Sequence, residues 1–542
     1  MNSAKEPWEH RHNTSESRPE RELGAALRNA EGRGQDTISS SLTDGVPGAG
    51  STATVRLMSP MPSVSYSITI RLEFAARSAA VSDITGRIEH HGATVTALDV
   101  SASGPERMRA DITVLTAGHD HAVEVVDDLR SVDGVELGKV SDRTFLAHLG
   151  GKLTIESKVP IRHRDDLSMV YTPGVARVVK AIADNPEDAR RLTIKRNTVA
   201  VVSDGSAILG LGDLGPLAAM PVMEGKAALF KRFADIDAFP ICLDAHSVED
   251  IVAHVKALAP VFAGINLEDI SAPRCFEIED RLRAELDIPV FHDDQHGTAI
   301  VVVAALRNAL RVVEKEIGSV RIVLSGAGAA GTAILRLLRA AGARDVVVTD
   351  IDGIVHEGRE NLTGRLPWIA EVTNPRGLTG TLQDAIRDAD VFIGVSAGNI
   401  LNAEDVATMA DRAVVFAMAN PIPEIDPAEA SKHAEVVATG RSDFANQINN
   451  VLAFPGVFRG LLDAHATHVN DRMLLAAARA LADVVTDEEL NPAYIIPSVF
   501  KEGVTKAVAG AVEQAAREEL GTVDTITGAV PAVYGEEITF TG

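Results

Sequence analysis

The stretch VRIVLSGAGAAGTAILRLLRA, residues 320–340, decides the fold of the larger part of this chain. Its first six residues form an apolar run that predicts a buried strand, and the apolar residues at its end have helical spacing. Between the two stands the loop Gly326-Ala327-Gly328-Ala329-Ala330-Gly331. In this context the first glycine permits a tight turn, the second lets a pyrophosphate approach the backbone, and the third lets the helix pack on the strand.

The segments after this loop continue the same architecture. Strands are expected at 345–349, 391–395 and 414–417, and helices at 332–341 and 382–387, which together predict a doubly wound parallel sheet. The second strand ends in Asp350. A carboxylate there accepts from the ribose 2′-hydroxyl of NAD and repels the 2′-phosphate of NADP, so NAD is the expected cofactor and NADP the alternative. The alternative interpretation is that Asp350 only caps a helix or a turn.

The first part of the chain has a different pattern. Residues 1–60 are rich in Ser, Gly, Glu and Arg and show no period, which predicts disorder. Residues 64–145 predict the order β-α-β-β-α-β of a small α+β domain. The first strand alternates, which would put one set of side chains on its buried face: Val64, Tyr66, Ile68, Ile70 and Leu72.

The rest of the chain follows a linker that begins at Gly150-Gly151. The expected parts are a mostly helical α/β domain at 152–300, the Rossmann-like dinucleotide domain at 301–460, helices that pack on this core at 461–520, and a loose tail at 521–542. The whole is therefore an α/β protein preceded by a small α+β domain.

The amino-acid composition limits the expected binding partners and the expected cellular compartment. Lys and Arg number 52 against 76 Asp and Glu, a net charge of −24, which argues against nucleic acid and anionic membranes as partners. The two cysteines, Cys242 and Cys275, indicate a reducing compartment. No apolar run is long enough for a membrane span, and the N-terminus lacks a secretory pattern, so a cytoplasmic enzyme is expected.

Two acidic pairs precede the dinucleotide fold, each directly after an apolar run. They are Glu268-Asp269 and Asp293-Asp294. One such pair is usually a solvated loop, but two at strand ends predict a site for a cation, since buried carboxylates need compensation. Oxygen ligands suit Mg²⁺ or Mn²⁺, whereas zinc would favour His and Cys.

A lysine and a tyrosine complete the candidate site. Lys226 stands in an otherwise apolar helical stretch, where burial and neighbouring cations would lower its pKa and make it a general base. Taken alone, it would more often be a surface lysine with a buried stem. Tyr171 precedes a Pro-Gly turn, where a tyrosine is usually a packing residue.

Together these segments resemble the malic enzyme family in its shorter bacterial form. The stretches that carry the resemblance are VYTPG at 170–174, ILGLGDLG at 208–215, EGK at 224–226, LED at 267–269, FHDDQHGTA at 291–299, the glycine loop, ANP at 419–421, and QINN at 447–450 followed by FPG at 454–456. They span residues 158 to 460 in the family's order. The resemblance implies a homodimer or larger homo-oligomer.

The resemblance also implies roles for individual residues. Tyr171 corresponds to the general acid, Lys226 to the base that takes the malate hydroxyl proton, and Asp293 to a neighbour that tunes the lysine. The metal ligands would be Glu268, Asp269 and Asp294; the nicotinamide or the substrate carboxylate would be held by Asn420 and Asn450. Larger family members carry an arginine where this chain has Ser206-Ala207, so another group must hold the substrate carboxylate.

The implied reaction converts malate to pyruvate and CO₂. Lys226 removes the hydroxyl proton while C2 gives its hydride to the nicotinamide, and the oxaloacetate so formed loses CO₂ with the cation stabilising the enolate. Tyr171 then protonates C3. The alternatives are a dehydrogenase that leaves oxaloacetate intact, a malolactic-type enzyme that releases lactate, and an inactive sensor protein.

Residues 64–145 resemble an ACT domain in pattern and length. Such a domain implies control by a small effector, for example an amino acid, that stabilises one domain arrangement. The alternative is a domain used only for assembly.

Overall fold

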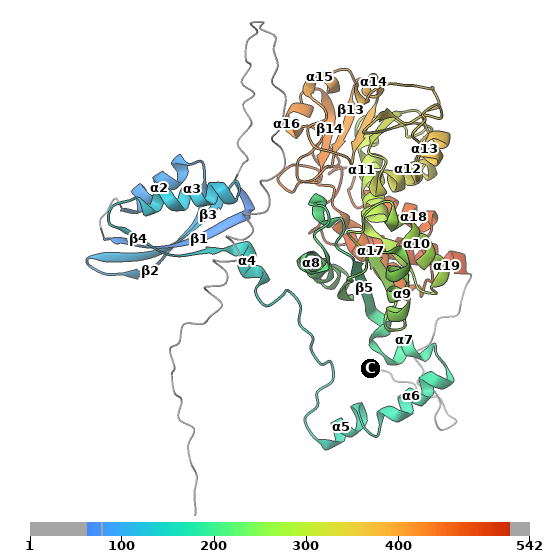
Figure 1. Cartoon of the computed structure of the whole chain (residues 1–542), viewed down its shortest axis with the longest axis horizontal. Helices are drawn as coiled ribbons and strands as arrows, with labels where there is room; N and C mark the ends of the chain where they lie inside the picture. Colours follow the sequence, from blue (N-terminus) through green and yellow to red (C-terminus); the bar gives the residue numbers. More distant parts are fainter. Residues whose placement is uncertain (1–61, 77–79, 521–542) are drawn as a thin grey trace, which may run out of the picture.

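The computed structural model describes residues 62–76 and 80–520 (Figure 1). The predictions for segments 1–60 and 521–542 lie outside the described residues. Three sheets organise the described part: one of four strands before residue 150, one of four strands in the middle and one of six strands after residue 320. Among the described helices, none is both long and apolar enough to cross a membrane.

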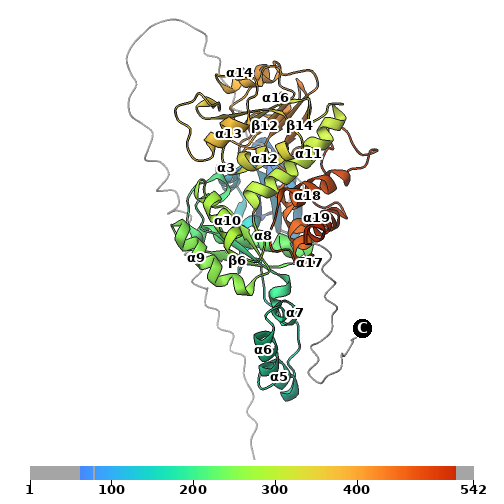
Figure 2. The ribbon, with the colours of Figure 1, turned by 90° about the vertical axis from the view of Figure 1, so that its right-hand side faces the viewer.

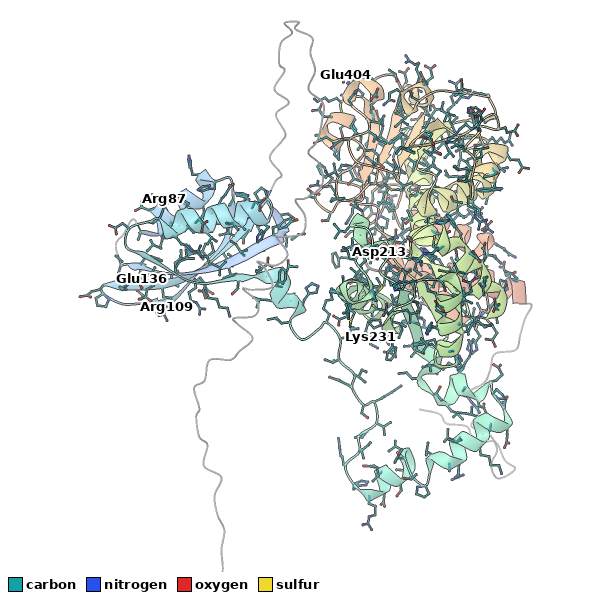
Figure 3. The ribbon with its side chains drawn as sticks, in the orientation of Figure 1. Arg87, Arg109, Glu136, Asp213, Lys231 and Glu404 are labelled. Carbon is teal, nitrogen blue, oxygen red and sulfur yellow. The ribbon has the colours of Figure 1, made fainter. Side chains whose placement is uncertain are left out.

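The first sheet has the expected β-α-β-β-α-β order, and its strands lie in the order β2-β3-β1-β4. Its elements are β1 (Ser63–Ala75), α2 (Ala80–His90), β2 (Thr94–Ser103), β3 (Arg107–Thr116), α3 (His119–Arg130) and β4 (Val135–Asp142). Both helices cover one face, where Ile70, Leu72 and Ile112 are fully buried (Figure 1). The opposite face is charged, and Figure 3 shows Arg109 and Glu136 on this unit.

The predicted buried face of β1 is wrong at its start. Val64 and Tyr66 are exposed, whereas Ile68, Ile70 and Leu72 are buried. The pairing of β1 with β3 shifts register between Ser63 and Ser67. An irregularity of this kind turns the side chains on either side of it to opposite faces, because the side-chain period of a strand is two.

The first unit ends with α4 (Arg143–His148), whose Thr144 hydroxyl donates to the Ser65 carbonyl of β1 at 3.0 Å. The middle part then begins with an arm of short helices, α5 (Arg164–Val170), α6 (Val175–Asp184) and α7 (Asp188–Leu192). No residue of α5 or α6 is buried, and both helices lie away from the rest of the chain in Figures 1 and 2. A parallel sheet follows, in the order β6-β5-β7-β8. Its elements are β5 (Thr198–Ser203), α8 (Pro216–Ala234), β6 (Asp237–Cys242), α9 (Val248–Leu258), β7 (Gly264–Leu267), α10 (Arg274–Glu285) and β8 (Val290–His292).

The third sheet is the predicted doubly wound one, in the order β11-β10-β9-β12-β13-β14. Its strands are parallel except for the hairpin strand β11. The elements are α11 (Thr298–Val312), β9 (Arg321–Ser325), α12 (Ala329–Ala340), β10 (Asp345–Asp350), β11 (Gly353–Ile354), α13 (Leu366–Val372), α14 (Leu382–Ile386), β12 (Val391–Gly394), α15 (Ala403–Val406), β13 (Ala413–Ala417), α16 (Pro427–Ala430) and β14 (Ala434–Thr439). Strand β14 is an addition to the predicted set.

Three C-terminal helices close the core: α17 (Phe454–Asp463), α18 (Asp471–Asp483) and α19 (Val504–Leu520). Helices α17 and α19 approach closely because Gly460 faces the backbone of α19; a Cβ there would lie 2.4 Å from the Ala509 carbonyl oxygen. The buried side chains of these helices belong to one apolar cluster with those of α8, α11 and α12. This cluster fixes the middle sheet against the dinucleotide sheet.

Candidate functional site

The centre of the candidate site is a buried lysine on α8. The Lys226 ammonium is hydrogen bonded to Asp293 and lies 2.9 Å from Glu268 Oε1. It also lies 4.1 Å from the centroid of the Phe454 ring at the start of α17. Lys231, further along the same helix, is at the surface and pairs with Asp237 at 3.0 Å (Figure 3). The two lysines therefore differ in environment although both belong to α8.

The prediction that Lys226 has a lowered pKa is wrong for this arrangement of side chains. Burial by itself would lower the pKa of this ammonium, but its neighbours are carboxylates and not cations. Asp293 and Glu268 together raise the pKa of Lys226 above its ordinary value. Proton abstraction by Lys226 thus requires that part of this negative charge be offset by another cation.

Asp293 is fully buried and joins three parts of the chain. Its Oδ2 accepts from Lys226 and from Asn450 Nδ2 at 3.1 Å, and Asn450 Nδ2 also lies 3.1 Å from Thr298 Oγ1. A Cβ at position 297 would lie 1.9 Å from Asp293 Oδ1, so only a glycine at this position leaves enough room for the Asp293 carboxylate. The resemblance predicts that Asn450 binds the substrate carboxylate or the nicotinamide. In the structure its amide nitrogen instead contacts Asp293 and Thr298.

The three predicted metal ligands lie together at the ends of β7 and β8. The Asp269 backbone N–H donates to Asp294 Oδ2 at 2.9 Å, and Glu268 Oε2 accepts from Asn266 Nδ2 at 3.0 Å. Burial and the Asp294 charge raise the pKa of Asp269 to about 7. Burial, incompletely offset by Lys226, also raises the pKa of Glu268. Crowded, poorly solvated carboxylates of this kind are the donor set that a hard divalent cation binds.

The donor chemistry fits a cation, but the side chains as arranged do not form a ligand shell. Within residues 62–76 and 80–520, no three His, Cys, Asp or Glu side chains are placed so that they could hold an ion. At Glu268, Oε1 pairs with Lys226 and Oε2 accepts from Asn266. Buried Asp269 Oδ2 has no hydrogen-bond partner. A cation would therefore need Glu268 to turn from Lys226 towards Asp269 and Asp294.

Ser206, where larger family members carry arginine, belongs to a buried network. Its hydroxyl donates to Asp204 Oδ1 at 2.6 Å and accepts from the Ser271 N–H at 2.9 Å. Arg274 Nη2 donates to Asp204 Oδ2 at 2.8 Å. The network holds the turn after β5 beside the segment that carries Asp269, since the Ala207 N–H donates to the Asp269 carbonyl. Arg274 is the nearby cation that the sequence reasoning missed, and it is already paired.

The glycine loop has the geometry that its spacing predicts. Gly326 has φ of 115°, and a Cβ there would lie 2.8 Å from the Val395 carbonyl oxygen. A Cβ at Gly331 would lie 1.8 Å from the Gly326 oxygen, whereas one at Gly328 would meet nothing within 4 Å. Ala327 lies in the loop, and Ala329 and Ala330 begin α12, whose N-terminus favours an anion.

Two more predicted residues stand at or just after strand ends of the same sheet. Asp350 ends β10 and pairs with Arg359, which the sequence reasoning missed. Asn420 follows β13 and lies against the segment 208–215, since a Cβ at Gly210 would be 3.1 Å from the Asn420 carbonyl oxygen. Glu424 was also missed: it is fully buried, accepts from the Ala419 and Ser396 N–H groups, and so joins the ends of β12 and β13. A lone buried acid in a loop has no sequence signal.

Tyr171 is the one predicted catalytic residue that the chain does not bring to the cluster. It ends α5 and is 66% exposed. Figures 1 and 2 both place α5 away from α8, which carries Lys226. Sequence order could not reveal this separation.

The fold and the site define a class: a dinucleotide-binding α/β protein with a buried lysine and carboxylates beside its Rossmann-like sheet. Comparison with known proteins then gives the family. The family model "Malic enzyme, N-terminal domain" matches residues 150–283, and "Malic enzyme, NAD binding domain" matches residues 295–517. The chain belongs to the malic enzyme family.

Individual relatives agree with this assignment. The chain is 56% identical over 449 residues to the NAD-dependent malic enzyme of Geobacillus stearothermophilus, covering 83% of this chain and 94% of the relative. It is 54% identical to the bifunctional malic/malolactic enzyme of Bacillus subtilis, covering 68% of this chain and 90% of that one. The crystal structure of the NAD-dependent malic enzyme of Thermotoga maritima superposes with a TM-score of 0.67 at 50% identity, covering 69% of this chain and 99% of that chain.

The loop geometry predicts different effects for two glycine substitutions. Gly331→Ala should lower both the melting temperature and dinucleotide affinity, because its Cβ collides with the Gly326 oxygen. Gly328→Ala should keep the melting temperature and weaken binding by about tenfold or more, because its Cβ would occupy space needed by the pyrophosphate. Thermal unfolding and NADH fluorescence titration measure the two effects. Unchanged NADH affinity in Gly328→Ala would remove this loop from the binding site.

Proposed function

We propose that this protein is a malic enzyme that oxidises and decarboxylates (S)-malate to pyruvate and CO₂ while reducing NAD in the presence of Mg²⁺ or Mn²⁺. The observation that carries the proposal is the buried Lys226 between Asp293 and Glu268, in a chain whose glycine loop fits a dinucleotide. A lysine and its carboxylates buried in this way serve acid–base chemistry on a bound hydroxyl. The two free cysteines agree with a cytoplasmic location.

Each residue of the cluster has a defined task in this reaction. Lys226, in the amine form that a bound cation would favour by offsetting part of the carboxylate charge, would accept the C2 hydroxyl proton of malate. Asp293, which itself accepts from Asn450, holds the lysine in place. The cation held by Glu268, Asp269 and Asp294 would supply charge stabilisation for the enolate, and the nicotinamide would accept the hydride. Asn420 and Asn450 supply amides for the substrate carboxylate or the nicotinamide. Tyr171 supplies the proton that C3 of the enolate takes up.

The first test is turnover of L-malate with Mn²⁺ and NAD. Wild-type protein should form pyruvate in step with NADH, and a chelator should abolish both. Lys226→Ala should lower kcat by at least about 100-fold and leave NADH affinity unchanged, because the proton acceptor is lost but the glycine loop is intact. The matched control is Lys231→Ala, a surface lysine on the same helix, which should keep full activity. Loss of NADH affinity in Lys226→Ala would mean a structural role.

A malolactic reaction is the second candidate, because a relative at 54% identity is a bifunctional malic/malolactic enzyme. The same scaffold could return the hydride to pyruvate before release. Separate assays of pyruvate, lactate and oxaloacetate in the malate experiment distinguish the reactions. Lactate without net NADH would replace the first proposal by this one.

The arm that carries Tyr171 supports a homodimer or a larger homo-oligomer. Its apolar side chains are exposed without a partner in the described chain; they include Ile155, Val159, Ile161, Leu167, Met169 and Val179. Contiguous exposed apolar groups mark an interaction surface. The proposed chemistry needs Tyr171 near Lys226, and the arm of one copy placed on another copy satisfies both requirements. Tyr171 then completes the active site of the partner.

Mixed oligomers test this arrangement. Tyr171→Phe and Lys226→Ala should each be nearly inactive alone. After co-refolding at a 1:1 ratio, a dimer with one copy of each has one site with both residues intact, so about a quarter of wild-type activity should return. If Tyr171 acts within its own chain, every mixed site lacks one residue and no activity returns. Mixing Lys226→Ala with itself is the control.

Residues 64–145 are proposed to bind a small effector such as an amino acid and to control the catalytic part. The relative from Geobacillus stearothermophilus aligns with 83% of this chain. The alignment is longer than the part of the chain after residue 150, so it includes residues of the first domain. The link to the core is direct: the Lys152 N–H donates to Glu224 on α8, two residues from Lys226. Deleting residues 1–145 should preserve turnover and remove the response to a panel of amino acids. Equal responses of both proteins would refute the control function.

A further inference from the structure

A buried glutamate connects the ends of two strands in the dinucleotide sheet. Glu424 follows β13 in the chain, and its side chain is fully buried. Its Oε1 accepts from the Ser396 backbone N–H at 3.0 Å, and its Oε2 accepts from the Ala419 backbone N–H at 2.9 Å. Ser396 follows β12 and Ala419 follows β13, so one carboxylate holds the loops at the carboxyl ends of both strands.

The surroundings of Glu424 leave its side chain one position. A Cβ on Gly394, the last residue of β12, would lie 2.3 Å from Glu424 Cδ, so any side chain at position 394 would displace the glutamate. The backbone of the same segment is also fixed. The Leu401 N–H donates to the Glu424 carbonyl at 3.0 Å, and the Asn399 N–H donates to the Pro423 carbonyl at 2.9 Å. Glu424 is therefore held firmly, and its carboxylate fixes the two loops in turn.

A carboxylate is the group that satisfies both loops. A backbone N–H that is removed from water needs an acceptor, and a carboxylate provides one on each oxygen. Glutamine has the same shape, but its NH₂ group would face one of the two N–H donors. Burial raises the pKa of Glu424, and the hydrogen bonds from Ala419 and Ser396 oppose this shift because they favour the charged form.

The two loops lie where the second half of a dinucleotide has to bind. The strand order is β10-β9-β12-β13; the glycine loop follows β9, and Asp350 ends β10. A dinucleotide binds across the carboxyl ends of such strands at the point where the strand order reverses, which here is between β9 and β12. With the pyrophosphate at the glycine loop and the adenosine ribose at β10, the nicotinamide lies over the ends of β12 and β13.

Asn420 stands directly after the Ala419 N–H that Glu424 holds. It is exposed, and a Cβ on Gly440, after β14, would lie 3.4 Å from its Nδ2. We propose that Glu424 is a positioning residue for the nicotinamide: it holds the loops after β12 and β13, and with them the Asn420 amide, in the arrangement that receives the nicotinamide carboxamide. This inference rests on the dinucleotide site of the proposed function. A role in the stability of the sheet alone predicts no selective effect on the nicotinamide.

The experiment compares NADH with ADP-ribose, which lacks the nicotinamide, by calorimetric titration of the full-length chain without malate. Glu424→Gln should weaken NADH by about tenfold or more and ADP-ribose by less than about twofold, because the loops after β12 and β13 move while the glycine loop stays in place. Gly394→Ala should give the same pattern, since its Cβ displaces the Glu424 side chain. Thermal unfolding shows which variants are folded at the titration temperature, and either variant suffices for the test.

Asp390 provides the matched control, because it accepts from the Arg321 backbone N–H at 2.8 Å at the opposite end of β12. Asp390→Asn should lower the melting temperature and change neither affinity. Equal weakening of NADH and ADP-ribose in Glu424→Gln, or an unchanged NADH affinity, would overturn the inference. Equal affinities of the wild-type chain for both ligands would also refute it, because nothing would then hold the nicotinamide. If wild-type protein binds neither ligand, the proposed function itself fails, so the two failures are distinguishable.

Discussion

An ammonium group away from water is stable only if opposite charge is placed beside it, and much of this molecule is arranged around that requirement at Lys226. The strand ends after β7 and β8 bring Glu268 and Asp293 to Lys226 on α8. Asp293 has room only because residue 297 is glycine, and it is held by Asn450 from the C-terminal side of the dinucleotide sheet. Removal of any one of these groups would leave a buried charge or amide without its partner, which is more costly than the loss of a surface pair.

Close backbone approach is the second constraint. Gly326 lies against Val395, Gly331 against Gly326, and Gly460 against α19, in each case at a distance that a Cβ could not occupy. The first two shape the turn between β9 and α12. The third lets α17 pack tightly, and α17 begins with Phe454, whose ring covers the Lys226 ammonium. The packing of the C-terminal helices is thus connected to the electrostatics of the candidate active site.

The arm with α5 and α6 differs from the rest, because its apolar side chains are not buried within the chain. A second copy that covers it would bury apolar area and could bring Tyr171 to the cluster around Lys226. Assembly and chemistry would then depend on the same contact. The linker at Lys152 places a further connection on α8, close to Lys226.

The sequence by itself determined most of the order of strands and helices, the place of the glycine loop between a strand and a helix, and the acidic pairs, because each is a local pattern fixed by side-chain period or backbone freedom. It also placed Asp350 at the right strand end. Only the tertiary structure decided what faces these groups: carboxylates and not cations around Lys226, Arg359 on Asp350, Glu424 between two loops, and the exposure of Val64, Tyr66 and Tyr171. The physical reason is that charge, hydrogen bonding and burial depend on residues that are remote in the chain, and a single sequence gives their identity but not their neighbours.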